Sequence, residues 1–554
     1  MSQMNELQEN LFQLLIEFDE ICKKHDIKYL LAAGASLGAV RNRRFLPWDD
    51  DIDLYITRDN WNKFRHIYET EENVLPEGRS LVYRENTKYY CNPLPRYINN
   101  DTTLIYVSQA LPGKSCGQHL ELFIFDPMPK GEKEKEEYLD LLHVYTELIS
   151  PYFVVNKNAS LEDWQRHYDL YVHYCERVDK EGEENVLKEL EETLQQYDIE
   201  DCDQYCMRWG IKNYIYDKEW FEEGEPGLFE GRKFPIGTNT ECILRVAYGD
   251  SWMYIPEYEE QISHSGLKDT RPFMEYTERY LPKINRESVF PQFIKNKRNN
   301  ASMFYTRKKV DMLVAKEKVA VGSIHVKKSL EGKDDYLRSL LENKEYETLN
   351  EEFKVYNSIQ LIPDVRKFNF MVPISDKNLA TLLFGLIEQG KYYDVNKYLS
   401  IRKLQDKELT DELIEIENLV EYCRELSVAR YDKKDASLVQ SILDEHESKY
   451  SNLLDSFRAK IWIKENDAES INDYEMIDQL CDDALSLYPF DGEIMAIQAK
   501  AKSECGFEKE AMELYEKAIH NTRNGLIWQK VEDESGISRL DIERELIEEL
   551  NDEN

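Results

Sequence analysis

Residues 47–54 read Pro-Trp-Asp-Asp-Asp-Ile-Asp-Leu, and this stretch decides the fold of the first half of the chain. From Asp51 to Thr57 acidic or polar side chains alternate with apolar ones, which predicts a half-buried β-strand. Because side chains along a strand alternate between faces, Asp51 and Asp53 are expected on one face. Like charges so close together raise each other's pKa values unless a cation neutralises them. The pattern favours a Mg²⁺ or Mn²⁺ site over a solvated acidic turn.

The glycine-rich stretch just upstream predicts a phosphate contact. Residues 28–33 form a short apolar run that is expected to be a strand entering a tight turn at Gly34. Gly34 and Gly38 allow the backbone to approach a ligand closely, and Ser36 stands where a helix over 36–42 is expected to begin. The positive end of a helix suits a phosphate group.

A third carboxylate and several arginines complete the candidate site. Glu121 lies in the apolar stretch 119–125, where an unpaired carboxylate would be costly. A metal is the favoured partner, and a buried arginine or lysine, or exposure on an edge strand, is the alternative. Arg41, Arg44 and Arg96 could offset the charge of a donor phosphate, since guanidinium groups match phosphate oxygens.

The length of 554 residues predicts two or more domains. Strands and helices alternate at first, which indicates an α/β domain, and residues 132–222 are expected to be a helical insertion or flank. Residues 331–554 have helical patterns throughout. Two stretches there share a turn glycine followed by apolar positions, as in tetratricopeptide-like helical hairpins: Gly390, Val395 and Leu399, and Gly506, Ala511, Tyr515 and Ala518. The predicted domains are a catalytic domain at 1–290, a basic linker at 291–330 and a helical domain at 331–554.

Composition narrows the function classes. The net charge of −37, from 108 acidic and 71 basic residues, argues against nucleic-acid binding. The ten cysteines lack CxxC pairs, the N-terminus does not resemble a signal peptide, and no apolar run approaches the ~20 residues of a membrane span. A cytoplasmic location is therefore expected. The basic segment 291–330 is interpreted as a linker helix packed against acidic neighbours, in preference to a peripheral contact with the inner face of a membrane.

Taken together, the glycine-rich turn, the basic stretch and the Pro-Trp-Asp-Asp-Asp-Ile-Asp block resemble the LicD family, whose domain belongs to the nucleotidyltransferase superfamily and is related to fukutin. The likeness covers about the first half of the chain. It continues, in order, through residues 96–103, Glu121 to Phe123, Asp126 to Pro129, Phe234 to Ile236, Tyr248 to Asp250 and His264.

The resemblance implies an α/β nucleotidyltransferase-like catalytic domain, a mixed sheet with helical insertions, followed by the all-α domain. It also implies transfer of phosphocholine, or of a polyol or sugar phosphate, from a CDP-activated donor to a cell-surface glycan or its lipid-linked precursor. Asp51 and Asp53 would bind the metal, with Glu121 in the place of a third carboxylate that is usually Asp. Ala35 and Ser36 replace the more usual Thr-Leu of the family.

The expected reaction is in-line attack of a glycan hydroxyl on the donor phosphorus. Asp49 or Asp50 could accept the acceptor's proton, and His264 either binds the donor or is a structural histidine. Two alternatives stay open. A nucleotidyltransferase would attach the nucleotide to a small molecule, and an inactive scaffold would act through its helical half, a possible platform for protein partners.

Overall fold

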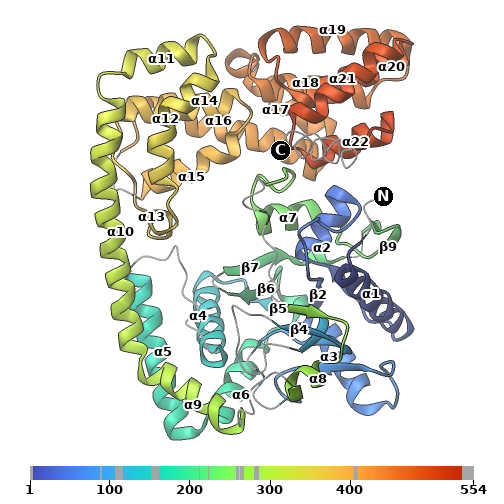
Figure 1. Cartoon of the computed structure of the whole chain (residues 1–554), viewed down its shortest axis with the longest axis vertical. Coiled ribbons are helices and arrows are strands. Elements are labelled where there is room, and N and C mark those ends of the chain that lie inside the picture. The colour runs from blue at the N-terminus through green and yellow to red at the C-terminus, as the bar shows by residue number, and fades with distance from the viewer. Residues whose placement is uncertain are drawn as a thin grey trace. The chain divides into compact units, whose positions relative to one another are not determined.

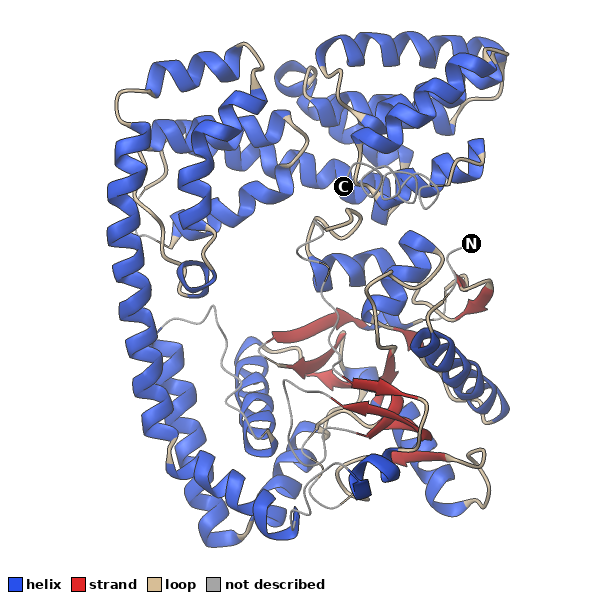
Figure 2. Cartoon of the chain, viewed as in Figure 1, coloured by secondary structure: helices blue, strands red, loops and turns tan. Residues whose placement is uncertain are grey.

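The protein divides into two compact units, which are described separately. One unit comprises residues 1–247 and 256–307, and the other comprises 248–255 and 308–554. Figure 1 shows the course of the chain, and Figure 2 shows that the strands of the described residues belong to the first unit, whereas the second is helical. The structure, a computed structural model, describes residues 4–87, 90, 92–105, 116–150, 161–210, 212–222, 224–256, 261, 267–279, 286–404 and 408–538.

The first unit is built on an eight-stranded mixed sheet. Its main path runs β1 (Leu30–Leu31), β2 (Asp53–Thr57), β5 (Cys116–Met128), β4 (Arg96–Ile105) and β10 (Leu267–Asp269). β3 (Arg79–Val82) pairs with β4, and β6 (Gln204–Trp209) joins the end of β5 to β7 (Lys212–Asp217). Only the pairing of β2 with β5 is parallel among the described strands. A separate hairpin consists of β8 (Gly227–Phe229) and β9 (Arg232–Phe234).

The alternation of side chains along β2 gives the sheet two different faces. Leu54 and Ile56 are buried in a core with the leucines of α1 and with Trp61 and Phe64 of α3. Tyr55 points to the other face and packs in a second, aromatic core with Phe123, Phe125 and Tyr216. Asp53 therefore shares the aromatic face, two positions before Tyr55.

Helices cover the sheet of the first unit and extend it. α1 begins at a capping box in which the side chains and backbones of Asn5 and Gln8 bond reciprocally, and its apolar stripe faces the sheet. The helices of this unit are α1 (Glu6–Lys24), α2 (Ala33–Leu37), the π-helical turn η1 (Gly38–Asn42), α3 (Arg58–Thr70), α4 (Glu132–Ile149), α5 (Leu161–Glu181), α6 (Glu183–Leu194), the short turns η3 (Ile199–Asp201) and η4 (Lys218–Phe221), α7 (Thr240–Tyr248), α8 (Phe273–Arg279) and α9 (Arg286–Asn299).

The predicted helical insertion over 132–222 is correct only in its first part. α4, α5 and α6 pack around a common apolar cluster, but β6 and β7 occupy residues 204–217. Tyr205, Met207 and Tyr216 alternate along these strands and fill the aromatic core. Tyrosines at every second position favour a strand, and this signal is hidden in a Glu- and Lys-rich region.

The second unit is helical, as predicted. It consists of α10 (Ala301–Leu330, from residue 308), α11 (Asp334–Glu342), α12 (Tyr346–Gln360), α13 (Pro363–Lys367), α14 (Asp376–Glu388), α15 (Tyr392–Lys403), α16 (Asp411–Ser427), η6 (Val428–Asp432), α17 (Ala436–Tyr450), α18 (Leu454–Asn466), α19 (Ile471–Leu487), α20 (Gly492–Glu504), α21 (Glu508–Asn521) and α22 (Gly525–Ser535). Gly506, at φ +83°, lies between α20 and α21, and Ala511, Tyr515 and Ala518 are buried behind it, as a helical hairpin requires. The fold class predicted from the sequence is thus confirmed.

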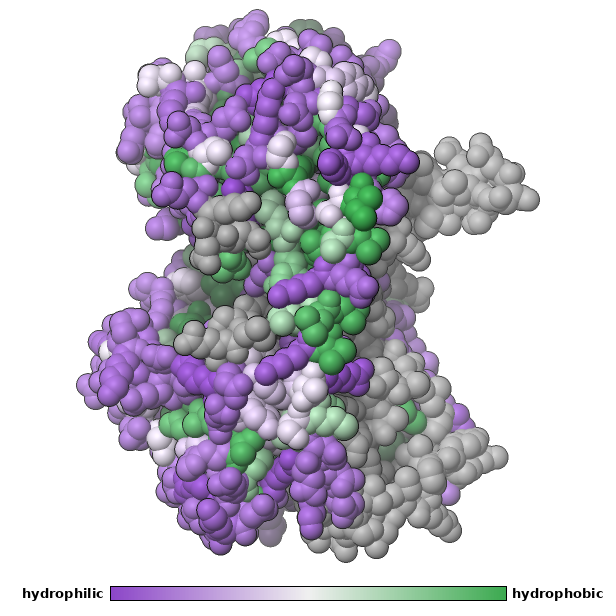
Figure 3. Space-filling model, turned by 90° about the vertical axis from the view of Figure 1, so that its left-hand side faces the viewer, coloured by the Kyte–Doolittle hydropathy of each residue, from purple (hydrophilic) through white to green (hydrophobic). Residues whose placement is uncertain are grey.

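The residues predicted as a basic linker form two helices, α9 and α10. Lys297 of α9 is buried and forms an ion pair with Glu147 at 2.9 Å, and Lys318 of α10 forms one with Asp364 at 2.5 Å. Apolar side chains are exposed along the outer side of α10 (Figure 3). No helix among the described residues is both long and apolar enough to span a membrane.

Candidate active site

The carboxylates of the candidate site meet on two neighbouring strands. In the parallel pairing of β2 with β5, Asp53 lies directly opposite Glu121, and in the antiparallel pairing of β4 with β5, Arg96 lies opposite the same glutamate. Asp51 and Asp49 precede β2 and are close enough for their charges to act on Asp53. The sheet therefore brings together residues that are about 70 positions apart in the chain.

Glu121 is held by a dense set of donors. Nε and Nη2 of Arg96 donate to its Oε1 at 2.8 and 2.6 Å, and Asn92 Nδ2 donates to the same oxygen at 3.1 Å. His119 Nε2 lies 3.8 Å from it. Burial alone would raise the pKa of Glu121, but Arg96 and His119 outweigh it and hold the pKa well below its usual range. Glu121 is therefore ionised, and a buried arginine, one of the two partners considered, is present.

Asp53 has the opposite electrostatics. Burial raises its pKa well above the usual range, and the charges of Asp51, Glu121 and Asp49 add to this, while Arg96 opposes it. Arg96 offsets only part of the charge of the surrounding carboxylates, and a divalent cation would offset the rest. In this respect the donor set fits a hard metal ion.

The described residues do not include a complete set of metal ligands. Among the residues that the structure describes, no group of three or more His, Cys, Asp or Glu side chains is positioned to hold a metal ion. Arg96 and Asn92 hold Oε1 of Glu121 in place. The ligand set of Asp51, Asp53 and Glu121 therefore stays a prediction.

The glycine turn supports the carboxylates closely. A Cβ added to Gly34 would lie 2.2 Å from Oδ2 of Asp49, so glycine is required for the aspartate to reach this position. A Cβ on Gly38 would lie 2.5 Å from the carbonyl oxygen of Arg44. Ala33 has φ +42°, a strained value for a residue with a side chain, at the point where the strand gives way to α2.

The expected start of the helix at Ser36 is wrong. α2 begins at Ala33, and the backbone N–H of Ser36 already donates to Ala32 at 3.0 Å, so it cannot serve a phosphate. The Ser36 side chain is different. Its Oγ is buried and has no hydrogen-bond partner among the described residues. A buried hydroxyl without a partner is costly, and a ligand oxygen would satisfy it.

The other predicted residues lie around this centre. Arg41 is buried, with its Nε donating to Asn42 at 2.9 Å, and Arg44 Nε donates to the Asn42 carbonyl at 3.2 Å. Asp50 is buried with Lys268 of β10 at 3.6 Å. His264 lies outside the described residues.

A known family model matches the part of the chain that contains most of the candidate site. Residues 26–103, which include the glycine turn, the aspartate block and Arg96, match the family model described as LicD/FKTN/FKRP, nucleotidyltransferase domain. Over these residues the chain is similar to a LicD-type nucleotidyltransferase domain.

Three bacterial proteins are similar to parts of this chain. The lipopolysaccharide cholinephosphotransferase LicD of Haemophilus influenzae is 24% identical over 268 residues, which cover 45% of this chain and 91% of that protein. An uncharacterized protein of Rickettsia typhi is 27% identical over 157 residues, covering 28% of this chain and 39% of its own. Another, from Rickettsia prowazekii, is 39% identical over 74 residues, covering 13% and 25%.

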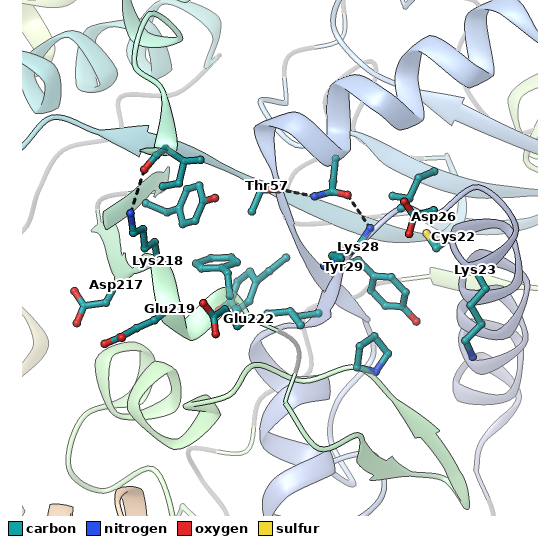
Figure 4. A pocket seen from close by; sticks show the side chains of 18 of the residues that line it. Cys22, Lys23, Asp26, Lys28, Tyr29, Thr57, Asp217, Lys218, Glu219 and Glu222 are labelled. Atoms are coloured by element: carbon teal, nitrogen blue, oxygen red, sulfur yellow. Dashed lines mark hydrogen bonds between the residues drawn. The ribbon is translucent and has the colours of Figure 1, made fainter. Parts of the chain in front are cut away.

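A large cavity of the first unit opens near Thr57, the last residue of β2 (Figure 4). It has a volume of about 1220 Å³, and its walls include Tyr29 and Lys28 before β1, Thr57 at the end of β2, Asp217 at the end of β7 and Glu219 of η4. In Figure 4, Asp217 and Glu219 lie on one side of the cavity and Lys28 lies on the other, with Thr57 between them. Tyr55 also lines the cavity and shares a strand face with Asp53. The cavity thus begins two positions along β2 from the carboxylates.

Sequence reasoning missed three residues of the LicD-type site: His119, Asn92 and Lys268. His119 could have been found, since it stands two positions before Glu121 on the same strand and period two places both on one face. Asn92 and Lys268 gave no such signal, because their positions depend on the chain returning to β5 and on β10 pairing with β4.

Proposed function

We propose that this protein transfers phosphocholine, or a polyol or sugar phosphate, from a CDP-activated donor to a hydroxyl of a cell-surface glycan or its lipid-linked precursor. The observation that carries the proposal is the meeting of Asp53 with Asp51, Asp49 and Glu121 at adjoining strands of a LicD-type domain. The similarity to a lipopolysaccharide cholinephosphotransferase supports the reaction class.

A metal, Mg²⁺ or Mn²⁺, would be held by Asp51, Asp53 and Glu121. The crowding that raises the pKa of Asp53 favours such a cation. When bound, the ion supplies charge stabilisation to the donor phosphates and the leaving nucleotide.

The protein's own residues have distinct tasks in this reaction. Arg96 and His119 keep Glu121 ionised, so that the carboxylate is ready to bind without losing a proton. The buried Ser36 hydroxyl donates to a phosphate oxygen of the donor. Asp49 or Asp50 accepts the proton of the attacking hydroxyl, and Lys268 lies 3.6 Å from Asp50.

The cavity beside β2 is the proposed place for the acceptor. Its walls combine tyrosines and a phenylalanine, such as Tyr29, Tyr205 and Phe221, with several exposed carboxylates. Carboxylates accept hydrogen bonds from sugar hydroxyls, and the same charges repel a polyanionic chain. The acceptor segment bound here is therefore expected to be a neutral part of the glycan.

The experiment is turnover of a panel of CDP-linked donors with Mg²⁺, followed by mass spectrometry of both products. CMP release that disappears in Asp51→Ala, and persists in a matched variant of the exposed Asp59, supports the proposal. An adduct heavier by CMP would instead indicate a nucleotidyltransferase. Absence of turnover together with absence of metal binding in calorimetry would favour the scaffold alternative, in which the helical unit binds other proteins.

A further inference from the structure

The outer side of α10 carries an apolar seam. Val310, Leu313, Val314, Val321 and Ile324 are exposed by 51%, 60%, 44%, 53% and 67%. At the helical repeat of 3.6 residues these five side chains fall within one face about 100° wide. This seam lies within the second unit and is visible as hydrophobic surface in Figure 3.

The opposite side of the same helix is the packed one. Ala315, Val326 and Leu330 are buried, and Val319 packs against the main core of the unit. The buried face alone therefore explains why α10 is held in the fold. It does not explain a second apolar face, because isolated exposed apolar residues are common but five on one stripe are not.

Cations border the seam on both sides. Arg307 and Lys318, which also pairs with Asp364, lie along one edge, and Lys309, Lys316 and Lys327 along the other, all of them exposed. The helix has seven Lys or Arg and only Asp311 and Glu317 as acids, in a chain whose net charge is −37. The charge of this stripe is therefore opposite to that of the protein as a whole.

This pattern identifies the partner by charge complementarity. A symmetric pairing of two copies through the seam would bring the same cations together, which opposes self-association. An anionic lipid surface matches both features, since apolar side chains enter the acyl boundary while lysines and arginines meet the headgroups. Glu317 lies within the seam, and because its charge disfavours the acyl region, the helix is expected to lie at the level of the lipid headgroups.

We propose that α10 lies flat on an anionic membrane surface through this seam and its cationic borders. From Arg307 to Lys327 the seam and its borders run about 30 Å along the helix, so the contact is extended. The inference does not depend on the proposed reaction. If both hold, the enzyme works on the surface where a lipid-linked acceptor is embedded.

The test is flotation of the full-length protein with vesicles of neutral phosphatidylcholine alone, or with about one third anionic phosphatidylglycerol. Binding to the anionic vesicles is expected, with a loss of roughly fivefold for each cation removed, measured on Lys309→Gln and Lys316→Gln. The variant Leu313→Glu/Ile324→Glu is expected to abolish binding. Both side chains are exposed, so the fold should tolerate the change, and Ile471→Glu/Met476→Glu on α19 is the matched control.

Three results would overturn the inference. Equal binding to neutral and anionic vesicles would remove the electrostatic basis. Equal loss in the α19 control would show that exposed apolar residues in general, and not the seam, cause binding. No flotation by the unaltered protein, combined with a dimer in light scattering that the Leu313→Glu/Ile324→Glu variant dissociates, would assign the seam to self-association. None of these readouts uses transferase activity, so failure here is separate from failure of the proposed function.

Discussion

Arg96 donates two hydrogen bonds, from Nε and Nη2, to a single oxygen of Glu121, at 2.8 and 2.6 Å. The two residues are register partners on antiparallel strands, and the arginine side chain is 4% exposed while the glutamate is 13% exposed. These contacts fix the orientation of the carboxylate and keep it charged.

Arg96→Met is expected to destabilise the first unit by about 3–5 kcal/mol, because it leaves Glu121 as a buried carboxylate without its counter-charge. Urea unfolding followed by tryptophan fluorescence measures this cost. The double variant Arg96→Met/Glu121→Gln should recover most of the stability but no transfer activity. If the single and double variants were equally unstable, the ion pair would not be the source of the loss.

Asp53→Asn is expected to abolish turnover, by roughly 10³-fold or more, and yet to raise the melting temperature at pH 8. The pKa of Asp53 in the folded protein is raised, so this residue's contribution to stability is present at low pH and is lost as the pH rises. Asparagine removes that loss, and the difference between variant and parent should shrink toward pH 4. Thermal unfolding over this pH range measures the effect.

Comparison of the unaltered protein with Asp53→Asn also tests whether a metal ion binds at this site. Mg²⁺ should raise the melting temperature of the unaltered protein, since a ligand that binds only the folded state stabilises it, and should have little effect on Asp53→Asn. Asp59→Asn on α3 is the matched control, because Asp59 is an exposed aspartate of the same unit. A full Mg²⁺ response in Asp53→Asn would place the ion elsewhere.

The sequence predicts features of the fold and site that depend on neighbouring residues, and it does not predict those that depend on distant segments coming together. The alternation around Asp53 and the apolar stretch around Glu121 predicted the two strands, since strand periodicity is local. β2 begins at Asp53, however, so Asp51 lies outside the strand and its place on the same face stays a prediction. The sequence could not decide between a metal and an arginine as the partner of Glu121, because that depends on which strand lies beside β5. The start of α2 was predicted three residues too late because Ala33 adopts a positive φ, a conformation that an alanine in the sequence does not predict.

Gly34→Ala is expected to lower transfer strongly and to cost about 1–3 kcal/mol of stability, because the new Cβ would sit 2.2 Å from the Asp49 carboxylate. The aspartate must then move away from the carboxylate group around Asp53. Combining the change with Asp49→Ala should restore stability, since the clash is gone, without restoring turnover. Thermal unfolding and CMP release on the same samples separate the two effects, and stability that stays low in the double variant would show a backbone cause.

His143 gives a stability prediction away from the site. Its ring stacks on His167 with centroids 4.3 Å apart, and burial, followed by the charge of Arg208, lowers its pKa to about 2. Because the unfolded chain takes up this proton near pH 6.5 and the folded chain does not, folding loses stability as the pH falls below 6.5. The loss should be about 1.4 kcal/mol at pH 5.5.

His143→Phe keeps a flat ring in the stack and removes the titration, so its urea midpoint should depend less on pH between 7 and 5.5 than that of the unaltered protein. His66→Phe, at an exposed position of α3, is the matched control for replacing a histidine by phenylalanine. The comparison is made within each pH, since the substitution also alters packing by a constant amount. Parallel pH profiles for the parent and His143→Phe would mean that the imidazole is protonated in the folded state, and that the stacked pair holds its charge against Arg208.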